Sequence, residues 1–133
     1  MIKKIEHIGI AVKDLKKSEE LFEKLLGEKP YKSEEVKSEG VTTSFFKVAG
    51  QKVELLHATS KESPISKFIE KRKEGIHHLA LHVDSIKNEV KRLKGLGFEF
   101  ISTTPKKGAD NKMIVFLHPK TTNGVLVELC EEI

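Results

Sequence analysis

Two histidines and two glutamates are the residues of this sequence whose types and spacing best suit metal-dependent chemistry. His7 and His78 are 71 residues apart, and Glu54 and Glu128 are 74 residues apart. Each of the four lies among apolar residues, in a stretch typical of a buried strand. Because an ionised carboxylate away from water needs a partner or a metal ion, both glutamates require an explanation.

The stretches that carry these four residues each occur twice. Residues 5–12 (IEHIGIAV) return as residues 76–83 (IHHLALHV), and residues 52–56 (KVELL) return as residues 126–130 (LVELC). The sequence therefore predicts two copies of one module, each supplying one strand histidine and then one strand glutamate.

Strand periodicity predicts how each module positions its pair. In residues 5–12, Ile8, Ile10 and Val12 share one face of the strand, and His7 lies on the other. A slip of one residue would turn a glutamate into the hydrophobic core, so the register is tightly constrained. The imidazole and carboxylate groups are therefore expected on the face opposite the core.

Cap and turn residues predict the remaining elements. Helices are expected to begin after Asp14, Ser63 and Ser85 and to end at Gly27, Gly75 and Gly97. The first helix is expected to pack through Leu15, Phe22, Leu25 and Leu26. Further strands are expected at residues 41–48, 52–57, 98–102, 112–118 and 125–130.

If the two modules pack with approximate two-fold symmetry, His7, Glu54, His78 and Glu128 converge on one divalent metal ion. Imidazole favours Zn, Co, Ni or Fe and carboxylates favour harder ions such as Mn or Mg, so the residues leave the identity of the metal open. Taken singly, each histidine could be a hydrogen-bonded filler, and Glu54 could pair with Lys47. The recurrence at matched positions in both halves favours the metal site.

Composition and length limit the class of protein. With 133 residues, the chain is expected to form one domain, residues 1–133, made of modules 1–60 and 75–133 joined by a helical connector. The net charge is +4, but basic and acidic residues are interleaved, which argues against a nucleic-acid surface. No apolar run could span a bilayer, there is no room for a signal peptide, and Cys130 is the only cysteine. We therefore expect a cytoplasmic protein without a disulfide or a membrane partner.

Several of these motifs also resemble a known family. Residues 7–12 (HIGIAV), 54–57 (ELLH), 75–81 (GIHHLAL), 116–120 (FLHPK) and 124–129 (GVLVEL) are similar to the methylmalonyl-CoA epimerases. That family belongs to the vicinal oxygen chelate superfamily, which is glyoxalase-like and includes bleomycin-resistance proteins. The resemblance covers nearly the whole chain, and the last two motifs are its most specific part.

The resemblance implies an α+β fold in which two tandem βαβββ modules form a curved, mostly antiparallel mixed sheet around a metal site. It implies an isomerase that interconverts the R and S forms of methylmalonyl-CoA by removing and returning the α-proton through a metal-stabilised enolate. The metal positions of the family fall on His7, His78 and Glu128, and a fourth, which is Gln in some members, falls on Glu54. One divalent ion (Co, Zn, Ni, Mn or Mg), an acyl-CoA substrate and a homodimer are implied with it.

The resemblance also suggests which residues act on the substrate. Glu128 is the expected catalytic acid/base on one face of the substrate. Some members carry a second proton-transferring glutamate where this chain has Thr43, and threonine is a poor proton acceptor at neutral pH. Thr43, His118 and Lys120 are expected substrate contacts, together with the loop of residues 106–112.

Two other functions compete with this interpretation. A glyoxalase I (lactoylglutathione lyase) would use a very similar set of histidines and glutamates, and only the motifs at residues 116–129 favour an epimerase over it. A metal-free binding or resistance protein on the same fold would tolerate loss of Glu54 and Glu128.

Overall fold

The computed structural model describes residues 1–133 and contains eight strands, three α-helices and two short 3-10 helices. The strands belong to a mixed sheet. The chain divides into two compact units, which we call the N-terminal unit (His7–His77) and the C-terminal unit (Met1–Glu6 with His78–Ile133). None of the three α-helices is both long and apolar enough to cross a membrane.

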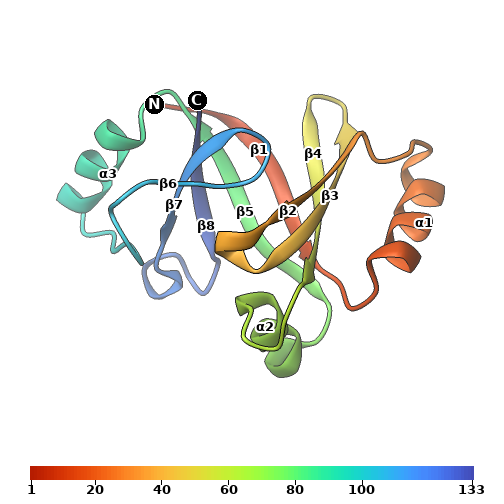
Figure 1. Cartoon of the computed structure of the whole chain (residues 1–133). Helices are drawn as coiled ribbons and strands as arrows, with labels where there is room; N and C mark the ends of the chain where they lie inside the picture. The colour runs from red at the N-terminus through yellow and green to blue at the C-terminus, as the bar shows by residue number, and fades with distance from the viewer. The chain divides into compact units, whose positions relative to one another are not determined.

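The N-terminal unit is built on four strands in the order β2-β3-β4-β1. Its elements are β1 (Ile2–Ala11, of which residues 7–11 lie in this unit), α1 (Leu15–Leu26), β2 (Lys32–Val36), the 3-10 helix η1 (Lys37–Glu39), β3 (Val41–Val48), β4 (Gln51–Ala58) and α2 (Pro64–Arg72). The β1–β4 pair is parallel, and the β2–β3 and β3–β4 pairs are antiparallel. The helix α1 packs beside β3 and β4 (Figure 1).

The predicted caps of α1 are confirmed. An Asp14 carboxylate oxygen accepts a hydrogen bond from the Lys17 N–H at 3.0 Å. Gly27 ends the helix with φ of 78°, and its N–H donates to the Glu23 carbonyl at 2.9 Å. These local bonds satisfy backbone groups that the first and last turns leave unpaired. The helix therefore begins and ends where its own sequence specifies.

The predicted cap of α2 is also confirmed at its start, where the Ser63 hydroxyl accepts the Ile65 N–H at 3.2 Å. Its end differs from the prediction. The helix stops at Arg72, and Lys73 takes a left-handed φ of 64° and donates its N–H to the Ile69 carbonyl. The expected stop at Gly75 is therefore two residues late.

The core of the N-terminal unit lies between α1 and one face of the sheet, and it contains Val12, Phe46 and Leu55 packed against Leu15, Phe22 and Leu26. The prediction that Leu25 packs with them is wrong, because Leu25 is 71% exposed. Successive residues of a helix are rotated by about 100°, so Leu25 is turned away from Leu26. Leu25 instead shares an exposed helix edge with Leu21, one turn earlier, which is 62% exposed.

The C-terminal unit repeats this plan with strands in the order β5-β8-β7-β6. Its elements are β5 (Gly75–Val83, of which residues 78–83 lie in this unit), α3 (Ile86–Gly95), β6 (Lys106–Lys107), β7 (Lys112–Leu117), the 3-10 helix η2 (Pro119–Thr121) and β8 (Val127–Glu132). The β5–β8 pair is parallel, and β6–β7 and β7–β8 are antiparallel. The parallel strand pair thus recurs at the same place in both units.

The core of the C-terminal unit lies between α3 and the sheet. The Ser85 hydroxyl caps α3 by accepting the Asn88 N–H at 3.2 Å, as predicted. The buried members of this core are Val83, Ile86, Val90, Leu93, Val115, Leu117, Val127 and Leu129. Alternation along β5, β7 and β8 places the other side chains on the opposite face of the sheet.

The predicted strand at residues 98–102 is wrong. Only one bridge forms there, between Phe100 and Leu117. The bonds on either side of it are His118 N–H to the Glu99 carbonyl at 2.8 Å and Ile101 N–H to the Phe116 carbonyl at 2.9 Å. The Glu99 N–H donates to the Thr121 hydroxyl at 3.2 Å, so the pairing with β7 extends no further. Phe98 and Phe100 still pack against the core, which explains their apolar pattern. The edge strand of the unit is instead β6, inside the expected loop.

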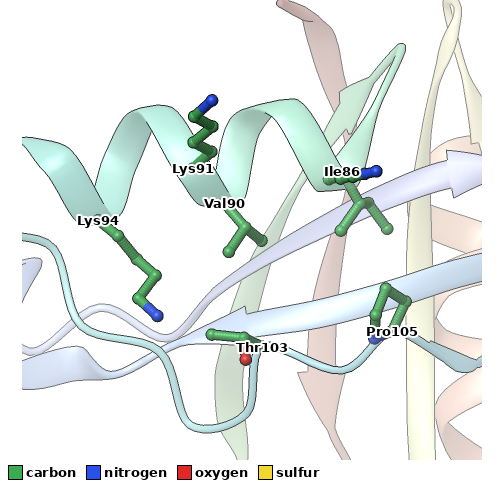
Figure 2. Close-up of a pocket in the computed structure, with 7 residues that line it drawn as sticks. Ile86, Val90, Lys91, Lys94, Thr103 and Pro105 are labelled. Atoms are coloured by element: carbon green, nitrogen blue, oxygen red, sulfur yellow. The ribbon is translucent and has the colours of Figure 1, made fainter.

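A groove of about 680 Å³ lies between α3 and the segment around Thr103 and Pro105. Figure 2 shows Ile86 and Val90 directed from α3 toward this segment, while Lys91 points away from it. The groove is lined by Ile86, Lys87, Val90, Lys91, Lys94, Thr103 and Pro105. Because these residues include no imidazole, carboxylate or thiol, the groove is not the predicted metal site.

Candidate metal centre

The N-terminal unit brings His7 and Glu54 together. The strands β1 and β4 run parallel with Gly9 opposite Glu54, so His7 lies two residues before the position that faces Glu54. His7 Nε2 is 3.2 Å from Glu54 Oε1. The two residues are 6% and 4% exposed, respectively. Both side chains lie on the face of the sheet opposite α1, as the alternation predicts.

The C-terminal unit brings His78 and Glu128 together in the same way. Its parallel strands β5 and β8 place Ala80 opposite Glu128, so His78 again lies two residues before the facing position. His78 Nε2 is 3.5 Å from Glu128 Oε1. Both residues are buried. Each unit thus holds one buried imidazole against one buried carboxylate, beside a residue with a very small side chain.

An aromatic ring completes each pair. Phe45 of β3 lies opposite Glu54, and Phe116 of β7 lies opposite Glu128. The ring centroids of Phe45 and His7 are 6.3 Å apart at 85°. Those of Phe116 and His78 are 6.0 Å apart at 89°. These edge-to-face contacts restrict the rotation of both imidazole rings.

The distances within each pair fit adjacent ligands of one divalent ion. Nitrogen and oxygen ligands lie about 2.1 Å from such an ion, so two of them are about 3.0 Å apart at right angles and about 3.4 Å apart in a tetrahedron. The observed separations of 3.2 Å and 3.5 Å lie in that range. Burial also removes competing water, and neutral imidazole with carboxylate is a common donor set for first-row metals. Each pair therefore has the chemistry and the spacing of half a metal site.

Thr43 is 1% exposed and lies on β3, two residues before Phe45. Its hydroxyl donates a hydrogen bond to the Glu34 carbonyl on β2 at 3.3 Å. A hydroxyl used in this way holds the edge strand in place. Its contact with a substrate stays a prediction.

His118 and Lys120 lie at the turn after β7, and both are exposed. His118 Nδ1 accepts a hydrogen bond from the Lys120 N–H at 3.1 Å and caps η2. Lys120 Nζ is 2.9 Å from a carboxylate oxygen of Glu99. The two residues thus stabilise their own turn, and a role in substrate binding stays a prediction.

Two features of the site were missed by reasoning from the sequence. The first is the pair of phenylalanines, since their positions opposite Glu54 and Glu128 depend on strand pairing. The second is the burial of Lys112, which is 9% exposed at the start of β7. The stretch that Lys112 begins alternates as an ordinary strand does, and nothing in this pattern indicates that the lysine is buried.

Glu89, a residue whose pKa is shifted, lies on α3, away from these pairs. Glu89 is buried, and the Arg92 guanidinium holds it with two hydrogen bonds of 2.8 Å and 3.1 Å. These bonds hold the pKa of Glu89 below its ordinary value, although burial alone would raise it. The pair therefore fixes the first turns of α3 rather than serving the metal centre.

Comparison with known proteins identifies the family. Residues 6–116 match the glyoxalase/bleomycin resistance protein/dioxygenase superfamily. The chain is 42% identical over 132 residues to the mitochondrial methylmalonyl-CoA epimerase of Dictyostelium discoideum, and the match covers 98% of this chain and 80% of that protein.

Solved structures agree in fold. The methylmalonyl-CoA epimerase of Mycobacterium tuberculosis is 31% identical, with a TM-score of 0.95 over 99% of this chain and 89% of that one. A Streptomyces coelicolor methylmalonyl-CoA epimerase in complex with 2-nitronate-propionyl-CoA is 28% identical, with a TM-score of 0.94 over 99% of this chain and 96% of that one. The α+β fold of the chain is thus the fold of these epimerases. With its duplicated βαβββ plan and repeated histidine–glutamate pairs, the chain belongs to the glyoxalase/bleomycin resistance protein/dioxygenase superfamily.

Proposed function

We propose that the chain is a metal-dependent methylmalonyl-CoA epimerase. Relatives and solved structures bearing that name match almost the whole chain, and one of the structures contains a CoA thioester analogue. The observation that carries the proposal is the buried histidine–glutamate pair, which occurs twice with the same register and nearly the same spacing.

His7, Glu54, His78 and Glu128 together would hold one divalent ion. This proposal is supported by the equivalence of the two pairs, because a half site with two donors leaves most coordination positions of an ion unfilled. The bound ion would act as a Lewis acid toward the negative charge that develops on the thioester oxygen. The residues do not select one metal among Co, Zn, Ni, Mn and Mg.

Glu128 would move the proton on one face of the substrate. As a carboxylate it would take the α-proton and leave an enolate, and return of a proton to the opposite face would invert the centre. Gly9 and Ala80, which lie opposite Glu54 and Glu128, place very small side chains next to the two carboxylates. Thr43 is unsuited to be the second base, because its hydroxyl donates to the Glu34 carbonyl. His118 and Lys120 would contact the polar part of the substrate from the end of β7.

The test compares two adjacent histidines of β5. We expect His78→Ala to lose its bound divalent metal and to lower the rate of epimerisation by at least about 100-fold. His77→Ala is the matched control, because His77 alternates to the other face and packs against Phe68 with ring centroids 4.9 Å apart. Elemental analysis gives the metal content, and deuterium incorporation at the α-carbon followed by NMR gives proton removal.

The outcome that contradicts the proposal is equally specific. If His78→Ala and His7→Ala both keep the metal content of the unmodified protein, the ion is not held by these residues. If the unmodified protein incorporates no deuterium into the thioester, the proposed reaction is wrong even when metal is bound.

We propose further that residues 1–133 act as one domain of two modules, in a cytoplasmic homodimer. The single cysteine is compatible with a reducing compartment. The exposed leucines of α1, Leu21 and Leu25, offer an apolar edge that a second copy could cover.

A further inference from the structure

Lys52 on β4 lies in the same row of the sheet as His7. The strand register places Lys52 opposite His7 on β1 and opposite Lys47 on β3. Residues directly opposite each other on neighbouring strands point to the same face, so Lys52 shares the face of His7 and Glu54. Neighbouring strands are about 4.8 Å apart, so a lysine side chain starts beside a proposed metal ligand.

Lys52 is the accessible residue of this part of the face. His7 and Glu54 are 6% and 4% exposed, respectively, whereas Lys52 is only half-buried. A lysine side chain is longer than that of histidine, and its charged end can stay in contact with solvent while its stem packs. A ligand that approaches this face of the N-terminal unit therefore meets a positive charge beside His7.

Lys47, the other lysine of the row, is directed away from Lys52. Its Nζ lies 4.9 Å from the centroid of the Tyr31 ring, which packs against the Phe45 ring at 6.0 Å between centroids. Tyr31 directly precedes β2, on the side of β3 that is away from β4. This cation–π contact lessens the repulsion that two like charges on opposite residues would otherwise cause.

The duplicated plan of the chain does not require a lysine at position 52. Lys52 lies opposite the histidine of its unit, and extending the register of β8 by one residue places Leu126 opposite His78 in the same way. The Leu79 N–H donates to the Leu126 carbonyl at 3.0 Å, which supports this pairing. The C-terminal unit therefore builds the same row with an apolar residue. Packing does not explain the charge of Lys52, and we look for its role in a negatively charged ligand.

The proposed substrate, a branched malonyl thioester, carries such a negative group. Its free carboxylate and its thioester carbonyl are bonded to the same α-carbon, so the two groups stay adjacent when the substrate binds. We propose that Lys52 binds the free carboxylate and makes the site selective for thioesters that carry one. This inference rests on the proposed function, in which the thioester oxygen lies at an ion held partly by His7. Removal of the α-proton places a second negative charge beside the carboxylate, and a neighbouring ammonium group lessens their repulsion.

The test compares a charged substrate with a neutral one of similar shape. In 2-methylacetoacetyl-CoA an acetyl group replaces the carboxylate of methylmalonyl-CoA, and the α-proton again lies between two carbonyl groups. Lys52→Leu installs the residue type of the C-terminal unit, Lys52→Gln is a polar uncharged alternative, and Lys52→Arg keeps the charge. Lys47→Leu is the matched control, because it removes the opposite charge-bearing side chain of the same row. Deuterium exchange at the α-carbon gives kcat and KM, and competitive inhibition gives the affinity for the neutral thioester.

We expect Lys52→Leu and Lys52→Gln to raise KM for methylmalonyl-CoA roughly 10–100-fold, as loss of a hydrogen bond between charged groups does. The affinity for the neutral thioester should not change. Lys52→Arg should keep most of the affinity for methylmalonyl-CoA, and Lys47→Leu should alter neither substrate. Elemental analysis should find the divalent metal retained in Lys52→Leu, because removing a positive charge beside His7 favours a bound cation.

Three results would overturn the proposal: equal losses of affinity for both thioesters, an unchanged KM for methylmalonyl-CoA, or the same effect from Lys47→Leu. Loss of the metal from both Lys52→Leu and Lys52→Gln would overturn it too, because the lysine would then maintain the metal site itself.

A separate measurement keeps this inference distinct from the proposed reaction. If the unmodified protein epimerises no methylmalonyl-CoA, the proposed function fails, and calorimetric titration with the two thioesters then tests Lys52 alone. Weaker binding of methylmalonyl-CoA by Lys52→Leu, with unchanged binding of the neutral thioester, would support the contact. Equal affinities of Lys52→Leu and the unmodified protein for methylmalonyl-CoA would refute it.

Discussion

At the scale of single residues, the histidine–glutamate pairs owe their geometry to a parallel strand pair. A glutamate opposite Gly9 or Ala80 meets little steric competition, so the preceding histidine can lean across to it. The two-residue alternation along the strands was sufficient to predict that each imidazole and each carboxylate would lie on the face opposite the core. The alternation could not predict that Phe45 and Phe116 contact the histidines, because strand pairing across a turn decides which residues they face. For the same reason the burial of Lys112 had no signal in the sequence.

The ring of Phe116 gives a prediction at this scale. We expect Phe116→Leu to weaken metal binding about tenfold, because groups that orient a metal ligand typically contribute this much. Phe98→Leu is the control, since Phe98 packs on the α3 side of the same unit. Both variants should lose similar stability in urea, and titration with a divalent metal should separate them. Identical metal affinities for the two would show that the ring only fills space.

At the scale of elements, the cap residues made the starts of the helices predictable from the sequence. Asp14 and Ser85 specify helix starts through bonds to N–H groups three residues away, so a local pattern was enough. The prediction of a strand at residues 98–102 was wrong because a contact with a distant part of the chain decides the pairing there. Its alternation is real, but the Glu99 N–H donates to the Thr121 hydroxyl instead of extending the pairing with β7, and no local stretch of sequence shows this competition.

The Glu89–Arg92 pair on α3 gives a pH-dependent prediction. Because the pKa of Glu89 is lowered in the folded state, the unfolded chain binds a proton more readily. The stabilisation is therefore complete above the ordinary Glu value near 4.5 and is lost as the pH falls through the lowered value. Since Arg92 is half exposed, we expect a contribution of only about 1 kcal/mol.

Urea unfolding between about pH 3 and pH 7 measures this contribution. Glu89→Gln should flatten the acid limb of the stability curve, whereas Glu99→Gln, which removes an exposed carboxylate, should leave the limb unchanged. An acid limb that is the same in Glu89→Gln and in the unmodified protein would mean that another group is responsible.

At the scale of the whole molecule, duplication divides the proposed ligand set evenly between two compact units, each with its own core. The repeat itself was readable in the sequence, because both copies kept the strand motifs. The boundary of the units was not, since contacts assign Met1–Glu6 to the C-terminal unit although these residues open β1.

The proposed shared ion would make the free energy of unfolding depend on metal concentration. A ligand that binds only the folded state at 100 times its Kd stabilises by about 2.7 kcal/mol, so we expect Tm to rise by several degrees. Thermal unfolding with added divalent metal and then with a chelator measures the effect. The rise should persist in His77→Ala and disappear in His78→Ala. An equal rise in both variants would place the ion elsewhere in the molecule.

The position of Cys130 has a practical consequence. The thiol is 0% exposed and lies 3.5 Å from the Leu81 carbonyl, and it is the only sulfhydryl in the chain. A thiol reagent can therefore reach it only when the C-terminal unit opens locally. The speed of modification thus measures how often the C-terminal unit opens, and the native chain carries this reporter without any engineered label.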